Sequence, residues 1–181
     1  MKGKGKEGSG EGGLPITSYF EACAMDSTDF IRLLQIRIMA YAHATEDELS
    51  VLEAVKNIVP TTLQGGLQPK TRRLDGHFGN PITVLEFEFF GEDQGNQILE
   101  NIAKRLGERE KRALAMAFHR HVGSDGSLYL RFDKQEAFLG RLKLETSDPI
   151  HVRIKFALEA KPGQDVVHSL RKVCERVGLL G

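Results

Sequence analysis

Basic and aromatic side chains recur at every second position in several short stretches of the chain. They alternate with apolar residues, so an extended backbone would place them together on one face of a sheet. Cations bind phosphates and flat side chains stack on unpaired bases, a combination typical of surfaces that bind RNA. We therefore predict an RNA-binding sheet face made of Arg37, Tyr41, Tyr129, Arg131, Arg141, Lys143, His151, Arg153 and Lys155.

Two other interpretations of this face remain open. The cations can pair across strands with carboxylates such as Glu86, Glu88 and Glu145, which would leave an ordinary solvated surface. Alternatively, helices or a second subunit cover the face, and the protein is a homodimeric protein-interaction module without direct RNA binding. The spacing of the residues does not choose among the three.

No other group of residues indicates a reaction. The sequence lacks a phosphate-binding P-loop, a dinucleotide-binding fingerprint and a His-Glu-x-x-His motif. His119 and His121 are two positions apart on an expected helix, so they point in different directions. His43, near Glu46 and Asp47, is more simply a strand end beside a helix cap. We therefore expect a non-catalytic protein with no cofactor and no metal site.

The candidate residues require strands to position them. Between Ser127 and Leu158, apolar and polar residues alternate over Leu128–Phe132, Leu142–Leu144 and Val152–Phe156, and Ser147-Asp148-Pro149 predicts a turn. These three runs predict an antiparallel meander. Further strands are expected over Leu33–His43, with Leu34 facing the core, and over Thr71–His77 and Ile82–Phe90.

Helical spacing separates these strand runs. Thr45 and Glu48 form a capping-box pattern, which predicts a helix as far as Pro60. Its apolar stripe would be Leu49, Leu52, Val55, Ile58 and Val59. Further helices are expected over Gln97–Leu106, over Glu108–His121 and from Pro162 to Val177. Hairpins segregated from helices indicate an α+β fold, an antiparallel sheet with helices packed on one face.

Length and composition indicate one folded domain. With 181 residues and 40% hydrophobic content the chain can form a core of its own. Residues 1–13 have no apolar side chain after Met1, so we expect a disordered tail. Residues 14–30 form an N-terminal extension whose pattern fits a helix or a strand, and residues 31–181 form the single domain.

Charge and cysteine content limit the classes of function. The formal net charge is zero, and residues 31–181 alone carry +2, so RNA binding requires local clustering of cations. Cys23 and Cys174 are too isolated for a disulfide scaffold or a zinc ribbon. No apolar run is long enough to span a membrane, and no secretory signal is evident. We expect a cytoplasmic protein.

Four blocks of sequence resemble a known family. They are His43–Glu48, Gly79–Ile82, Leu128–Gln135 and Val152–Phe156. In this order they resemble archaeal proteins described as predicted exosome subunits or RNA-binding proteins, over roughly residues 33–177. The resemblance implies an archaeal protein with a fold similar to ribosomal protein L5. It also implies an accessory role in RNA processing or degradation, with RNA and exosome or ribosome components as partners.

Overall fold

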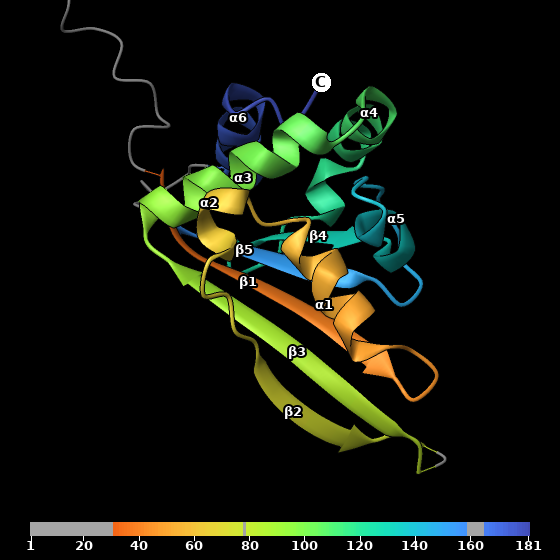
Figure 1. The fold of residues 1–181 in the computed structure, drawn as a ribbon. Coiled ribbons are helices and arrows are strands. Elements are labelled where there is room, and N and C mark those ends of the chain that lie inside the picture. The colour runs from red at the N-terminus through yellow and green to blue at the C-terminus, as the bar shows by residue number, and fades with distance from the viewer. Residues whose placement is uncertain (1–30, 78, 159–164) are drawn as a thin grey trace, which may run out of the picture.

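The structure, a computed structural model, describes residues 31–77, 79–158 and 165–181. The predictions for residues 1–13 and 14–30, and the helix start at Pro162, lie outside these residues. Within them, five antiparallel strands form one sheet in the order β2-β3-β1-β5-β4, and helices cover one of its faces (Figure 1). The predicted α+β class is confirmed. No helix in the described ranges is long and apolar enough to cross a membrane.

The strands and helices of the described residues have the following bounds. The strands are β1 (Ile31–His43), β2 (Lys70–Asp75), β3 (Pro81–Phe90), β4 (Leu128–Phe132) and β5 (Ile150–Leu158). The helices are α1 (Glu48–Lys56), α2 (Thr61–Gln64), α3 (Glu92–Arg105), α4 (Glu108–Met116), α5 (Lys134–Phe138) and α6 (Val166–Arg176). The helix expected over Glu108–His121 ends at Met116, and a short 3-10 helix, Phe118–Arg120, follows it.

The core lies between the sheet and the helices. Every second residue of strands β1, β3, β4 and β5 is buried beneath the helices, as the period of two predicts. They include Ile36, Ile38, Phe87, Leu130, Phe132, Ile154 and Phe156, and they pack with Ile98 and Ile102 of α3 and Leu170 of α6. Burial on this face forces the intervening side chains onto the opposite, helix-free face (Figure 1).

A β-bulge near the start of β1 contradicts the prediction that Leu34 faces the core. Leu33 lies opposite Phe156 and Gln35 lies opposite Lys155, so Leu34 is the extra residue. Leu34 is 40% exposed, while Leu33 is buried against α3. From Gln35 onward, buried and more exposed residues of β1 alternate as predicted.

Helix α1 begins later than its capping-box pattern predicts. Asp47 is the N-cap, and its carboxylate accepts a hydrogen bond from the backbone N–H of Ser50 at 2.9 Å. Thr45 is therefore not the cap. Leu49 is exposed, so the predicted apolar stripe is wrong at this position. The buried positions of the helix are Val51, Ala54 and Val55.

The predicted middle strand of the meander does not form. Asp133 instead caps helix α5, its carboxylate accepting from the N–H of Glu136 at 2.9 Å. The chain then returns along the outer edge of β4, where Leu144 makes a single bridge to Phe132. Strand β4 consequently pairs directly with β5. Helix α5 precedes the alternating residues Leu142–Leu144, and three alternating residues are too few to form a strand.

Candidate nucleic-acid interface

The helix-free face of the sheet aligns its side chains in rows, because directly opposed residues of antiparallel strands share a face. We call this the open sheet face. One row runs across all five strands, through Lys70, Glu86, Met39, His151 and Arg131. The next runs through Glu88, Arg37, Arg153 and Tyr129. Flanking rows hold Arg72 with Tyr41, and Phe90 with Gln35 and Lys155.

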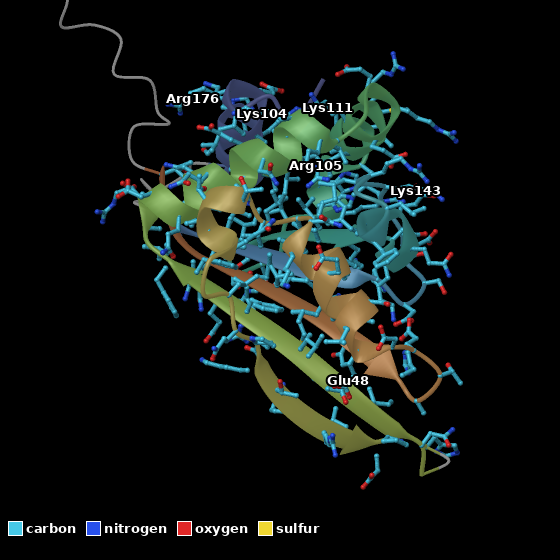
Figure 2. The ribbon with its side chains drawn as sticks, in the orientation of Figure 1. Glu48, Lys104, Arg105, Lys111, Lys143 and Arg176 are labelled. Carbon is cyan, nitrogen blue, oxygen red and sulfur yellow. The ribbon has the colours of Figure 1, made fainter. Side chains whose placement is uncertain are left out.

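The open sheet face unites seven of the nine predicted residues. They are Arg37, Tyr41, Tyr129, Arg131, His151, Arg153 and Lys155. Arg141 and Lys143 were placed there by a strand that does not form, and they lie beyond the outer edge of β4. Arg141 pairs with Glu136 of α5 at 2.6 Å. The carbonyl of Lys143 accepts from the N–H of Asp133, and its side chain is seen beside α5 (Figure 2).

A pocket opens at the centre of this face. Its volume is about 260 Å³. The walls are a block of six side chains from β1, β5 and β4, and Leu130 and Val152 complete the lining. The six are Arg37, Met39, Tyr129, Arg131, His151 and Arg153. The two rows that cross these three strands therefore enclose a hollow that carries cations, an imidazole and a phenol.

The β2–β3 half of the face is electrically balanced. Glu86 and Glu88 have side chains only 13% and 11% exposed, and cations surround them. The Nε atom of Arg37 lies 3.1 Å from Glu86 and its Nη2 atom 2.8 Å from Glu88. Lys70 also pairs with Glu88, and Arg72 lies 3.6 Å from Glu86. Hydrogen bonds from Lys70 and then Arg37 hold the pKa of Glu88 below its ordinary value.

The β4–β5 half carries the unbalanced positive charge. Arg131 and Lys155 are exposed and make no ion pair with any residue in the described ranges. Arg153 is partly neutralised, because its Nη2 atom lies 2.5 Å from Asp125. Its guanidinium also lies 5.8 Å from the centre of the Tyr129 ring. Ion pairing thus accounts for one half of the face and leaves the other half positive.

Glu145 does not form the cross-strand ion pair that the interpretation as an ordinary solvated surface predicts. Its carboxylate accepts from the backbone N–H groups of Thr146 at 2.7 Å and Ser147 at 3.3 Å. Those hydrogen bonds hold the pKa of Glu145 below its ordinary value. The group therefore stabilises the turn before β5 instead of forming an ion pair with Arg131.

His151 presents a flat ring at the edge of the pocket. Burial lowers the pKa of His151, and the charge of Arg131 lowers it further, against the opposing effect of Asp148. The Tyr41 ring meets the imidazole edge-on, with centroids 6.0 Å apart at 89°. A lowered pKa favours the neutral imidazole at neutral pH, which suits stacking and hydrogen bonding to a base more than binding to a phosphate.

Several residues of the face were not predicted from the sequence. Lys70 and Arg72 come from β2, and Phe90 stands at the end of β3 with 63% of its surface exposed. A signal for Phe90 was present, because it continues the alternation of Glu86 and Glu88. It is an additional aromatic surface on the open sheet face.

A buried lysine explains the cluster near His43. Oxygen or nitrogen atoms of His43, Glu46 and Asp148 lie within 4.8 Å of one another, an arrangement that can hold a cation. The ammonium of Lys134 lies 2.8 Å from Glu46, 2.5 Å from Asp148 and 2.9 Å from the carbonyl of Tyr41. Lys134 therefore supplies positive charge to these carboxylates and ties α5 to β1.

Some cations of the helix layer are paired within their own helix. Lys104 lies 3.4 Å from Glu100, and Lys111 lies 3.5 Å from Glu108, each within one helix (Figure 2). Arg171 pairs in the same way with Glu175 at 3.1 Å. Such pairs reduce the local positive field.

The protein is an α+β protein with a basic open sheet face, and comparison with known proteins gives its family. A family model described as RNA binding matches residues 35–156, which extend from β1 to β5. The chain belongs to this RNA-binding family. The match spans the pocket and every predicted residue on the open sheet face.

Relatives and solved structures agree with this assignment. The chain is 35% identical to RNA-binding protein PAB1135 of Pyrococcus abyssi over 142 residues, 77% of this chain and 92% of the relative. Among structures, protein AF2318 of Archaeglobus fulgidus has a TM-score of 0.66 and 25% identity, covering 81% of this chain and 99% of that one. Mth689 of Methanothermobacter thermautotrophicus has a TM-score of 0.62 and 29% identity, covering 78% and 97%. The predicted likeness to archaeal RNA-binding proteins is confirmed, whereas the exosome association and the likeness to ribosomal protein L5 stay predictions.

Proposed function

We propose that the protein binds RNA through the β4–β5 half of the open sheet face and acts as a non-catalytic accessory factor in RNA processing or degradation. The observation that carries this proposal is the exposed charge of Arg131, which lines the pocket, and of Lys155, neither of which has an ion pair among the residues that the structure describes. Ion pairs within the protein reduce the attraction of the neighbouring Arg37 and Arg153 for a phosphate, whereas Arg131 and Lys155 have no such pair in the described ranges.

The arrangement of the cations suits an extended backbone. Arg153 and Lys155 are two residues apart on β5, so they are separated by about 6.6 Å along the strand. Arg131 lies on β4 beside His151, one row further along. The three cations thus follow a diagonal across two strands. Phosphates placed along this diagonal leave their bases free to turn toward Tyr129 and His151.

The lining of the pocket supports a binding role. Cleavage of a phosphodiester is helped by a general acid and a general base, or by carboxylates that hold metal ions. The lining offers one imidazole, His151, and no carboxylate. Glu86 and Glu88 stand next to it but are engaged by Arg37, Lys70 and Arg72. The residues are therefore arranged to hold RNA.

The accessory role and the partners are a finer proposal. They rest on the resemblance to archaeal predicted exosome subunits and on the relative named an RNA-binding protein. We propose that the partners include exosome components. Association with ribosome components rests only on the predicted likeness to ribosomal protein L5 and is the weaker proposal. In the competing homodimer model, a second copy would cover the open sheet face and exclude RNA.

Crosslinking in cells tests the proposal. After ultraviolet irradiation, RNA and crosslinked peptides are recovered with the protein, together with its bound proteins. We expect crosslinks to peptides containing Tyr129 or His151, and recovery of exosome components. Crosslinks confined to the helices would contradict the sheet-face site. Without exosome components, the proposed complex would be wrong although RNA binding would stand.

Two assays with purified protein complete the test. End-labelled RNA incubated with the protein should remain full-length, and shortening of the RNA that persists after repeated purification would overturn the non-catalytic assignment. Gel filtration with and without RNA addresses the homodimer. A dimer that dissociates on adding RNA would show that both ligands use one face, whereas a dimer that never binds RNA would contradict the proposal.

A further inference from the structure

Arg37 differs from the other arginines of the pocket in how it is held. Its Nε and Nη2 atoms each face a carboxylate, at 3.1 Å from Glu86 and 2.8 Å from Glu88. These contacts fix the plane of the guanidinium and partly offset its charge, because Glu86 is shared with Arg72 and Glu88 with Lys70. The side chain nevertheless remains 44% exposed. It therefore offers a fixed, flat surface and a remaining N–H edge, but little net attraction for a phosphate.

The opposite side of the pocket has the complementary character. Arg131 is exposed and makes no ion pair within the described residues, so its charge is available to a phosphate. His151 and Arg153 of β5 lie between the strands of the two arginines, and Tyr129 lies on β4 beside Arg131. Burial and Arg131 lower the pKa of His151, which favours its neutral form. The pocket thus has an exposed cation, Arg131, at β4 and a planar, ion-paired guanidinium, Arg37, at β1.

The size of the hollow limits what can enter it. At about 260 Å³ it lies below the roughly 300–1,000 Å³ typical of pockets for drug-sized ligands. A single planar ring system fits this size, and the Met39 side chain provides apolar contact for it. An RNA duplex cannot supply such a group, because its bases are paired and stacked within the helix.

We propose that the pocket holds one unpaired RNA base, with Arg37 contacting the base and Arg131 contacting a neighbouring phosphate. This inference rests on the proposed function, and it adds single-stranded RNA as the class of ligand. Glu86 and Glu88 then act as positioning residues: they hold the guanidinium of Arg37 in place and prevent it from competing with Arg131 for phosphate. Arg37 selects for a base, and the β4–β5 cations retain the strand.

The test compares a short single-stranded RNA with the same strand carrying abasic riboses at its central positions. Both have the same phosphates, so only the base contact differs. Stacking of one base contributes roughly 1–3 kcal/mol, and the full-length protein should bind the intact strand about 5- to 150-fold more tightly. Arg37→Ala should remove this preference and leave the dependence of log affinity on log salt unchanged. Arg131→Ala should weaken both strands and flatten that dependence by about 0.7.

Two control variants separate a base contact from a structural role. Arg37→Lys keeps the charge but lacks the planar fork, so it too should lose the preference for the intact strand. Lys70→Ala also removes a partner of Glu88 but lies outside the pocket lining, so it should keep that preference. If Arg37→Ala unfolds, Tyr129→Ala provides the same comparison from the other side of the pocket.

The outcomes distinguish this inference from the proposed function. If the wild-type protein binds intact and abasic strands equally and Arg131→Ala still weakens both, the base pocket is wrong and the RNA-binding face stands. If Arg131→Ala has no effect while binding persists, the face itself is wrong. Tighter binding of a fully paired duplex than of the single strand would also overturn the inference. Binding to neither strand would overturn both proposals.

Discussion

The Nη2 atom of Arg37 lies 2.8 Å from an Oε1 atom of Glu88, a residue 51 positions away on the neighbouring strand. This pair places a nearly buried carboxylate at the centre of a basic face. It divides the open sheet face into a balanced half on β2 and β3 and a positive half on β4 and β5. The division is the basis of both proposals.

Glu88→Gln should move the boundary between the two halves. The amide keeps hydrogen-bonding groups but removes one negative charge, so Arg37 and Lys70 gain attraction for phosphates. We expect tighter RNA binding at low salt, and a steeper dependence of log affinity on log salt by up to about 0.7 for one added contact. Glu100→Gln, on the helix layer, is the matched control and should change neither quantity. Equal behaviour of the two variants would mean that RNA does not reach β3.

The pKa of His151 should lie below 6.5, its ordinary value, because of burial and then the charge of Arg131. A titration followed by NMR of the imidazole protons measures it directly. Arg131→Ala should raise the pKa of His151, whereas Lys104→Ala should leave it unchanged. A pKa of His151 above 6.5 in the wild-type protein would contradict the described environment of the ring.

The same lowered pKa predicts how stability responds to acid. The unfolded chain takes up the proton first as pH falls through about 6.5. Folding is therefore destabilised progressively below that pH, until the folded-state pKa is passed. Unfolding of wild-type protein and His151→Gln across this range should show the smaller acid effect in the variant.

Gly95→Ala should destabilise the fold although Ala favours a helix by about 1 kcal/mol over Gly. An added Cβ would stand 2.1 Å from Cδ2 of Leu33, which is buried between β1 and α3. We expect a net loss of about 1–2 kcal/mol from overpacking. Gly65→Ala is the control, because nothing lies within 4 Å of its added Cβ. Chemical denaturation measures both, and equal stability of the two variants would place Leu33 elsewhere.

Lys134→Met should leave Glu46 and Asp148 without their shared cation. We expect a loss of about 2 kcal/mol, below the roughly 3–5 kcal/mol of a fully buried pair, because both carboxylates are partly exposed. Lys56→Met, which breaks the exposed pair with Glu53, is the control and should cost little. A small loss in both would mean that the Lys134 cluster does not hold α5 to β1.

Acid should separate these two lysine variants further. Burial would raise the pKa of Asp148, but the hydrogen bond and charge of Lys134, with His43, hold it below its ordinary value of 3.8. The stability this pair contributes is present above about pH 3.8 and is lost as pH falls through the lower, folded-state pKa. Lys134→Met should lack this part of the acid response, and Lys56→Met should retain it.

The sequence predicted the open sheet face where the alternation continues over five residues or more. In β1, β4 and β5 the pleat fixes a period of two, and Arg37, Tyr129 and Arg153 lie as that period requires. The prediction failed at Leu142–Leu144 because three alternating residues are too few to establish a strand. Asp133 caps helix α5 at this point, and the helix directs Arg141 and Lys143 away from the sheet.

The balance of charge on the face was not predictable from periodicity. It depends on cross-strand register, which relates residues far apart in the chain. Arg37 lies opposite Glu88 and pairs with it, whereas Lys155 lies opposite Gln35 and has no ion pair in the part of the chain that the structure describes. The choice among an RNA-binding, an ion-paired and a covered surface therefore required the positions of these partners.

Salt-titrated RNA binding tests the central claim most directly. The full-length protein is compared with the double variant Arg131→Ala, Lys155→Ala and with a control, Lys104→Ala, Arg112→Ala, that removes two cations from the helix layer. We predict that the first double variant weakens binding to every single-stranded RNA tested and flattens the dependence of log affinity on log salt by about 1.4, at roughly 0.7 per phosphate contact. The control should match the wild-type protein. Unchanged affinity and slope in a folded Arg131→Ala, Lys155→Ala protein, or an equal loss in the control, would contradict the assignment of RNA binding to the sheet face.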